Sequence, residues 1–196
     1  INDRVSLQNA TTGSYSLQNG QLEGSAYFGN PELGKLFLSP WDKAYNDDGS
    51  YNTDLSSSIY NPLYIVANDI NRKKQLRAMN NATLKMSITE KLQFTSSLGI
   101  DYLQTEELYY DNRIHGDGVD VDDAGNDGSS YAYSNRSFNW VWKNMLEYSL
   151  NFGSSHRVDL KGIYEAQKNR FQTLGTGGIA IAAEGLYYPS SVATPD

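Results

Sequence analysis

The sequence predicts an all-β fold, namely a segment of a large antiparallel transmembrane β-barrel with long loops at one end of its strands. Apolar and polar residues alternate over unusually long stretches, short and long connections alternate along the chain, and aromatic residues stand near both ends of the apolar stretches. A period of two places side chains on opposite faces of a strand, whereas a helix would spread them around its circumference.

The composition excludes several classes of protein and of site. The 196 residues carry a formal net charge of −7, which argues against a nucleic-acid partner because phosphate binding needs clustered cations. The longest purely apolar run, Ile179 to Ala183, is far shorter than the ~20 residues of a membrane helix, whereas alternating barrel strands are compatible with a polar average composition. Cysteine is absent, so disulfides, thiolate metal sites and a cysteine nucleophile are excluded.

The alternation is clearest between Leu76 and Ile88. Every second residue from Leu76 onward is apolar except Asn80, and every residue between them is polar except Met79. The same pattern recurs along the chain and predicts five strands. They lie near residues 4–17, 75–89, 91–109, 136–151 and 156–172.

Short and long connections follow one another in a regular order. The links near residues 89–91 and 152–155 are tight, whereas the loops near residues 18–72, 110–135 and 173–196 are long and polar. Structureless loops longer than ~12–15 residues are uncommon in compact soluble domains. Short turns at one end of the strands and long loops at the other are typical of outer-membrane barrels.

Strand length and aromatic placement also favour a membrane wall. Soluble strands usually have ~5–6 residues, whereas a tilted strand needs ~9–11 to cross a bilayer. The ten steps from Phe138 to Tyr148 give roughly 25 Å of height at a tilt of ~40°. Six aromatics on the apolar faces are therefore predicted to form membrane girdles. They are Phe94, Tyr102, Phe138, Trp140, Trp142 and Tyr148.

One alternative remains open at this stage. A soluble, secreted β-sandwich that binds glycans would bury the same aromatics between two sheets and leave its charged face in water. Five strands cannot close a barrel, since the smallest membrane barrels use about eight. Because the chain also opens without the apolar core of a signal peptide, we expect these residues to be an internal segment of a longer protein.

No catalytic, metal or cofactor site is predicted. Asp120, Asp122 and Gly125 fit three positions of an EF-hand loop, but Ala124 and Tyr131 stand where ligands are needed, so a solvated acidic loop at 116–128 is the better interpretation. Calcium bound irregularly by these aspartates stays open. The Ser-Ser-His run at 154–156 lacks a nucleophile-elbow sequence, and we expect no enzyme.

Several segments, in this order, resemble the SusC/RagA-type TonB-dependent outer-membrane transporters. Residues 18–31 read QNGQLEGSAYFGNP, 38–52 read LSPWDKAYNDDGSYN, and 61–72 read NPLYIVANDINR. Further along, 92–102 read LQFTSSLGIDY and 139–164 read NWVWKNMLEYSLNFGSSHRVDLKGIY. The resemblance covers roughly residues 1–170.

The resemblance implies a 22-stranded barrel in the bacterial outer membrane that imports nutrients. It implies an N-terminal plug and a segment that contacts TonB, both expected outside these 196 residues. It also implies a SusD-like surface lipoprotein that closes the barrel as a lid, and glycans or peptides as substrates. We expect outer-membrane lipid around the wall and no cofactor.

Aromatic residues in the long loops are the candidates for contact with substrate or lid. Exposed aromatic rings can stack on sugars or contact peptides, and they can equally pack the loops together. The candidates are Trp41, Tyr45, Tyr51, Tyr109 and Tyr110.

Overall fold

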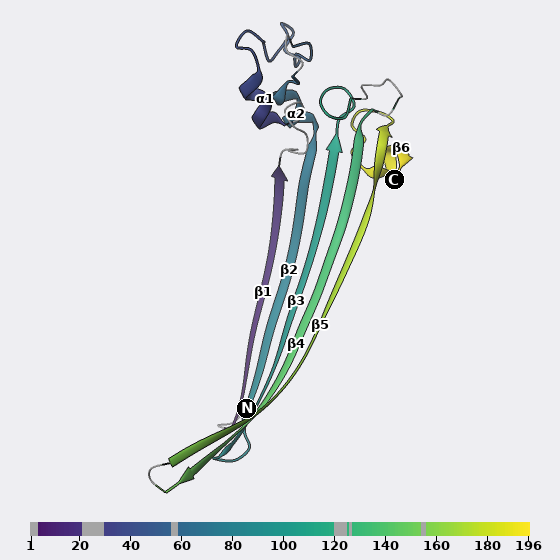
Figure 1. Ribbon diagram of the computed structural model, residues 1–196. Helices are drawn as coiled ribbons and strands as arrows, with labels where there is room; N and C mark the ends of the chain where they lie inside the picture. Colours follow the sequence, from purple (N-terminus) through teal and green to yellow (C-terminus); the bar gives the residue numbers. More distant parts are fainter. Residues whose placement is uncertain (1–3, 21–29, 56–58, 120–124, 126, 154–155) are drawn as a thin grey trace. The chain divides into compact units, whose positions relative to one another are not determined.

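The computed structural model describes residues 4–20, 30–55, 59–119, 125, 127–153 and 156–196. Within these residues one sheet is formed, in which each strand pairs with its neighbours along the chain (Figure 1). The all-β prediction and the prediction of an antiparallel barrel segment are confirmed. The strands are β1 (Val5–Gly20), β2 (Ile70–Ser87), β3 (Leu92–Asp111), β4 (Ser129–Phe152), β5 (His156–Ile181) and β6 (Val192–Pro195).

The strands are longer than the alternation suggests. β4 begins at Ser129 rather than near residue 136, and β5 continues to Ile181 rather than ending near residue 172. β6 lies inside the stretch 173–196 that was expected to be loop, and it pairs antiparallel with the end of β5. Backbone ladders do not require a two-faced side-chain pattern, so the pairing persists where the alternation fades.

Two short helices lie within the stretch 18–72. α1 (Pro31–Phe37) and α2 (Pro62–Asn68) each begin with a proline that follows an asparagine N-cap. Proline suits the first helical position because its missing N–H has no partner there, and asparagine oxygens accept from the free N–H groups of the first turn. A 3₁₀ turn, η1, covers Pro189–Ser191. Neither helix has the length and apolar character needed to cross a bilayer.

The chain divides into two compact units, which are described separately. The strand unit comprises residues 1–15, 75–104 and 135–172. The loop unit comprises residues 16–74, 105–134 and 173–196, and it includes both helices and η1.

In the strand unit, β2 to β5 present one apolar face and one polar face. The apolar face bears the even-numbered side chains of these strands and leaves large hydrophobic groups open: Leu98 is 39% exposed, Trp142 43% and Leu160 56%. Among the described residues no second sheet covers this face, because all strands belong to one sheet. The dry centre that a β-sandwich requires is therefore not formed by the part of the chain that the structure describes.

The loop unit has a small buried core. Ile65 of α2, Tyr110 of β3 and Ile181 of β5 are each 2% exposed. The ring of Tyr187 meets that of Tyr110 edge to face, with centroids 5.1 Å apart. The Ser130 hydroxyl donates to the carbonyl oxygen of Tyr187 at 2.9 Å, which holds the segment after β5 against the sheet.

Gly177 of β5 lies beneath the ring of Tyr131 on β4. A Cβ at this position would be 2.2 Å from Tyr131 Cδ1 and 2.7 Å from the carbonyl oxygen of Ser130, so one of the two strands would have to move. We expect Gly177→Ala to destabilise the protein by about 1–3 kcal/mol. Thermal unfolding of the purified protein measures this change.

Gly162 of the same strand provides the control. Nothing lies within 4 Å of a Cβ built there, so Gly162→Ala should be neutral or slightly stabilising. Equal midpoints for the two variants would contradict the close approach of Tyr131 to β5.

Candidate functional site

Most charged side chains on the polar face of the strand unit form ion pairs with one another. Arg77 of β2 forms a two-point contact with Asp101 of β3: Nε donates to Oδ1 at 3.0 Å and Nη2 donates to Oδ2 at 2.8 Å. Planar guanidinium groups suit carboxylates in this geometry. Both side chains are partly exposed, so the pair fixes geometry on a wet surface more than it adds stability.

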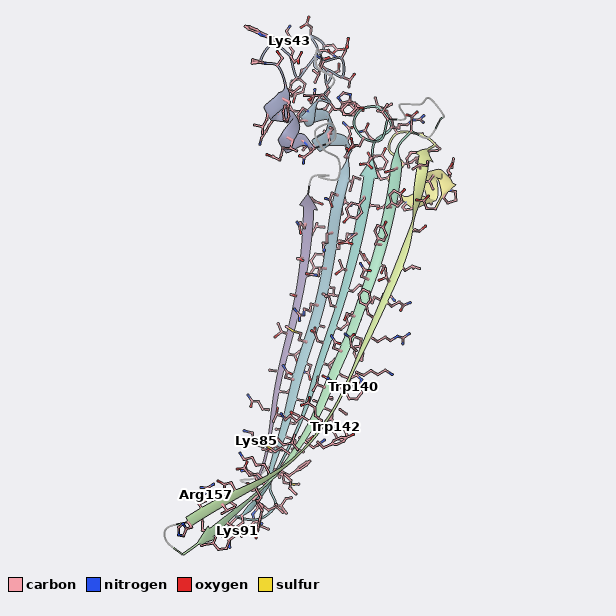
Figure 2. All side chains as sticks on the ribbon, in the orientation of Figure 1. Lys43, Lys85, Lys91, Trp140, Trp142 and Arg157 are labelled. Carbon is pink, nitrogen blue, oxygen red and sulfur yellow. The ribbon has the colours of Figure 1, made fainter. Side chains whose placement is uncertain are left out.

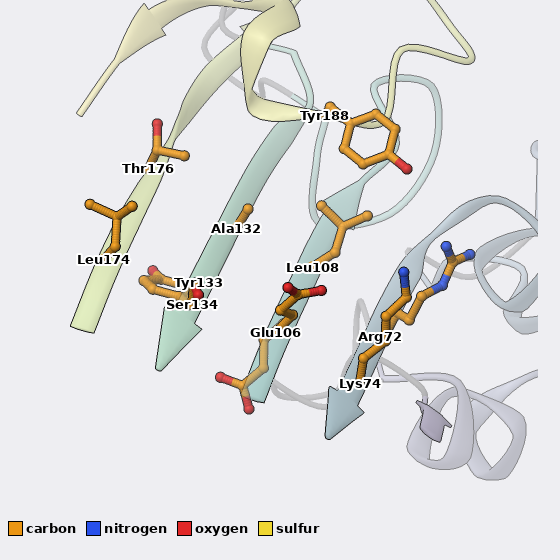
Figure 3. A pocket seen from close by; sticks show the side chains of 11 residues that line it. Arg72, Lys74, Glu106, Leu108, Ala132, Tyr133, Ser134, Leu174, Thr176 and Tyr188 are labelled. Atoms are coloured by element: carbon orange, nitrogen blue, oxygen red, sulfur yellow. The ribbon is translucent and has the colours of Figure 1, made fainter. Parts of the chain in front are cut away.

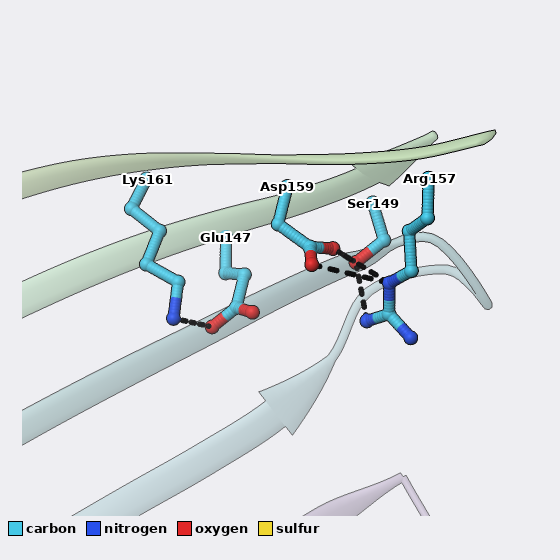
Figure 4. Close-up of polar contacts among 5 residues, drawn as sticks. All are labelled: Glu147, Ser149, Arg157, Asp159 and Lys161. Atoms are coloured by element: carbon cyan, nitrogen blue, oxygen red, sulfur yellow. Dashed lines mark hydrogen bonds and ion pairs between the residues drawn. The ribbon is translucent and has the colours of Figure 1, made fainter. Parts of the chain in front are cut away.

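The same face continues over β4 and β5 (Figure 4). Lys161 Nζ lies 3.4 Å from Glu147 Oε2. Asp159 Oδ1 accepts from Arg157 Nε at 3.0 Å and from the Ser149 hydroxyl at 2.6 Å. Such mutually paired charges indicate a face built to meet water or other polar groups.

A groove of about 740 Å³ lies on this face, around Gly99 of β3. A Cβ on Gly99 would be 3.0 Å from Asn81 Oδ1, so the glycine leaves the space that the Asn81 side chain and the groove occupy. Its amide side chains offer donors and acceptors together, which suits peptide bonds or sugar hydroxyls. The polar-face side chains that line it are Met79, Asn81, Asp101, Asn139, Val141, Gln167 and Asn169.

The aromatic residues predicted as girdles lie on the opposite, apolar face. Trp140 and Trp142 follow each other along β4 (Figure 2). The Trp142 indole Nε1 donates to the Ser96 hydroxyl at 3.1 Å, and its ring meets Tyr164 edge to face at 6.2 Å. Phe138 is 41% exposed and Tyr148 36%, so their rings remain available to an apolar surrounding.

In the loop unit, Asn61 is the centre of a buried polar cluster. Its backbone N–H donates to His115 Nε2 at 2.6 Å. Its side-chain amide donates to the carbonyl oxygens of Ala44 and Asn52 at 2.8 and 2.9 Å, and its Oδ1 accepts from the Leu63 N–H at 3.0 Å. The side chain caps α2 and binds the 44–52 loop to it.

His115 and Asn112 connect this cluster to the end of β3. The His115 ring meets Tyr60 and Tyr64 edge to face, with centroids 4.8 and 5.3 Å apart. Its backbone N–H donates to Asn112 Oδ1 at 2.9 Å. Because Nε2 accepts a hydrogen bond, the ring is neutral, and burial lowers the pKa of His115.

Asp69 closes the cluster at the C-cap of α2. Its Oδ1 accepts from the backbone N–H of Asn112 at 2.9 Å and from Asn112 Nδ2 at 2.6 Å. Burial is the largest influence and raises the pKa of Asp69 from its ordinary 3.8 to about 7. We name the set Asn61, Asp69, Asn112 and His115 the loop cluster.

The raised pKa of Asp69 predicts how the loop cluster depends on pH. The folded cluster keeps a proton that the unfolded chain releases above pH 3.8, so the stabilisation from this group is complete below pH 3.8 and is lost as pH rises through about 7. Asp69→Asn retains an acceptor oxygen and cannot ionise. We expect it to slow hydrogen exchange in the cluster at pH 8 by about tenfold or more relative to the parent chain.

At pH 5 the difference between the two proteins should be much smaller than at pH 8, because only part of the stabilisation has been lost at pH 5. His115 acts in the opposite direction: its lowered pKa gives stabilisation that is present above about pH 6.5 and lost as pH falls. Since both proteins retain His115, the difference between them isolates Asp69. A constant difference at pH 5 and pH 8 would contradict the burial of an ionisable carboxyl group here.

The five loop aromatics have different surroundings. Trp41 is 89% exposed and Tyr45 47%. The rings of Tyr45 and Tyr51 pack at 5.2 Å, and Tyr109 packs against Tyr133 of β4 at 6.2 Å. Tyr110 is 2% exposed, so it cannot contact substrate or lid unless the loop unit rearranges.

A cavity of about 270 Å³ lies in the loop unit beside Tyr188 (Figure 3). Arg72, Lys74 and Glu106 line one side, and Leu108 and Leu174 are among the apolar side chains elsewhere in its wall. Charged and apolar side chains line this cavity together. The sequence does not reveal it, because its residues come from five separate stretches of the chain.

The predicted acidic loop with its possible calcium ligands falls partly on residues 120–124, which lie outside the described residues. Ser154 and Ser155 of the Ser-Ser-His run also lie outside them. Among the residues that the structure does describe, no group of three or more potential metal ligands comes together.

Comparison with known proteins places the fold. No protein-family model matches the chain, and no curated protein matches it. Two solved structures are similar over 100% of this chain: the RagAB peptide importer in the "closed-closed" state (14% identity, TM-score 0.73) and the RagAB peptide transporter (14% identity, TM-score 0.74). The chain spans 22% and 23% of those chains, and at this identity the likeness shows the fold.

Proposed function

We propose that this chain forms part of the barrel wall of a SusC-type, TonB-dependent importer in the bacterial outer membrane. In this proposal the apolar face of the strand unit meets lipid, and the polar face lines the interior. The observation that carries it is the confinement of acidic side chains to one face of the strand unit. Within β2 to β5 of the strand unit, all four carboxylates lie on the polar face, namely Asp101, Glu147, Asp159 and Glu165.

Membrane physics explains why such a division would be maintained. A charged side chain facing hydrocarbon is costly, whereas charges facing a water-filled interior are not. In water, a face of exposed Leu98, Trp142 and Leu160 would be an unusually large apolar patch and would favour aggregation. In a membrane the same face would contact the lipid acyl chains, and no further protein would be needed to shield it from water.

Peptides are the first substrate class to test, and glycans the second. The groove around Gly99 presents amide groups from β2, β4 and β5, which can bond to extended peptide backbones in both senses. The two similar structures are described as a peptide importer and a peptide transporter, which supports the same order. The proposed role is passage and capture, without covalent chemistry.

A SusD-like lipoprotein is proposed as the lid over the long loops. Trp41 and Tyr45 are the exposed candidates for contact with lid or substrate, with Tyr51 and Tyr109 packed beside other tyrosines as supports. TonB would act on a part of the complete protein outside these strands.

Fractionation and uptake test the proposal together. The complete protein should be recovered in outer membranes, and cells lacking it should lose uptake of labelled peptides, which the intact gene restores. Recovery of the complete protein as a soluble monomer would overturn the proposal in favour of a secreted binding module. Recovery in the membrane with unchanged peptide uptake and lost glycan uptake would change only the substrate class.

A further inference from the structure

Most cations on the polar face of the strand unit are paired with a carboxylate, with Lys85 of β2 as the exception among the described residues. On the polar face, Arg77, Lys143, Arg157 and Lys161 each have a carboxylate within 3.9 Å. On the apolar face, Arg136 of β4 and Lys168 and Arg170 of β5 are exposed, and none has a carboxylate partner among the described residues. We name these three residues the basic patch.

Within the strand unit, the basic patch has no counter-charge on its own face. Every Asp and Glu of β2 to β5 in the strand unit has an odd number and lies on the polar face, whereas the three cations have even numbers. The protein as a whole is acidic, with a net charge of −7, yet no acidic residue of β2 to β5 lies on this face of the strand unit. Clustered like charges repel one another unless an anion lies between them.

The register of β4 and β5 places these cations beside aromatic rings. The ion pairs Glu147–Lys161 and Lys143–Glu165 join residues that lie opposite one another. The same register puts Arg170 opposite Phe138 and Lys168 opposite Trp140, and Arg136 precedes Phe138 by two residues on the same face. Directly opposite side chains have Cβ atoms about 5 Å apart, so three cations and two rings share one patch.

The patch lies at one end of the apolar face. It is at the end of the strand unit's β4 and β5 that is farther from Phe152 and His156, and the apolar side chains Trp142, Leu146 and Leu160 lie between the patch and these two residues. Cations next to an apolar face suit a ligand with an anionic head and an apolar tail. Arginine in particular binds phosphate with two parallel hydrogen bonds.

We propose that the basic patch binds the phosphorylated head of a membrane glycolipid of the lipid A class, with its acyl chains on the apolar face. This inference rests on the proposed function, because it needs the apolar face to meet lipid. A head with two phosphates complements three cations, whereas a zwitterionic phospholipid already neutralises its own phosphate.

Native mass spectrometry of the complete protein, purified from outer membranes in mild detergent, tests the inference with lipid A as the probe. A variant with Arg136→Gln, Lys168→Gln and Arg170→Gln should bind lipid A at least about tenfold more weakly than the parent protein. A second variant, with Arg136→Lys, Lys168→Arg and Arg170→Lys, keeps the charge and should retain most of the binding.

The control removes the same charge elsewhere. Lys43→Gln, Lys85→Gln and Lys91→Gln change residues outside the basic patch, and lipid A binding should stay as in the parent protein. Equal binding by all variants recovered from the membrane would overturn the glycolipid site and leave the importer proposal intact. Equal loss with phosphatidylglycerol and lipid A would overturn the choice of glycolipid, and absence of the parent protein from the membrane would overturn the importer proposal itself.

Discussion

Replacing Asn61 with alanine is expected to open the loop cluster, at a cost of about 2–4 kcal/mol. The side chain is 1% exposed and makes every hydrogen bond that its amide nitrogen can donate. Alanine removes the cap of α2, worth about 1 kcal/mol. It also leaves the part-buried carbonyl oxygen of Asn52 without its amide donor, at about 1–3 kcal/mol. The carbonyl oxygen of Ala44 loses the same donor but still accepts from the backbone N–H of Asn52 at 3.0 Å.

Hydrogen exchange across residues 44–69 measures this opening, and Asn30→Ala is the matched control. Asn30 also precedes a proline and caps a seven-residue helix, since its Oδ1 accepts from the N–H groups of Glu32 and Leu33. Its bonds are exposed, so Asn30→Ala should cost only about 1 kcal/mol. Equal protection in the two variants would show that Asn61 acts as an ordinary helix cap and does not bind the 44–52 loop.

The strands could be predicted because one physical rule governs them. Leu84, Leu98 and Leu160 alternate with polar residues, and a strand with two different surroundings needs that alternation. Alternation no longer predicts a strand where neither face of that strand meets an apolar environment. At 129–135 the chain reads SSYAYSN, and β4 there is held by backbone pairing and by tyrosines that pack across to neighbouring strands. Contacts of this kind leave no periodic pattern in the sequence, so this part of β4 could not be predicted.

The loop cluster could be predicted only in part. The Asn-Pro pairs at 30–31 and 61–62 are helix-start signals, and they could have identified α1 and α2 within the long first loop. The contact of His115 with Asn61 could not be found, because 54 residues separate them and neither residue belongs to a recognisable motif. The even numbers of Arg136, Lys168 and Arg170 already place them on the apolar face. That they form one patch depends on the register between β4 and β5, which the sequence does not give.

Replacing Leu98 with arginine is expected to prevent stable assembly in the membrane. Leu98 lies midway between the girdle aromatics Phe94 and Tyr102 on the apolar face of β3, where the proposal places the centre of the bilayer. Arginine facing lipid at that depth costs about 2–4 kcal/mol. On a surface in contact with water, the same change would alter stability by no more than about 0.5 kcal/mol.

Ser97→Arg separates these two environments, because Ser97 is the neighbouring residue on the opposite, polar face. An interior in contact with water accepts the arginine there, so Ser97→Arg should assemble as the parent protein does. The folded fraction in outer membranes, read from the heat-dependent mobility of the complete protein on gels, compares the two variants. If Leu98→Arg and Ser97→Arg assemble equally well, both faces of β3 are in water, and the wall of an importer cannot be what these strands form.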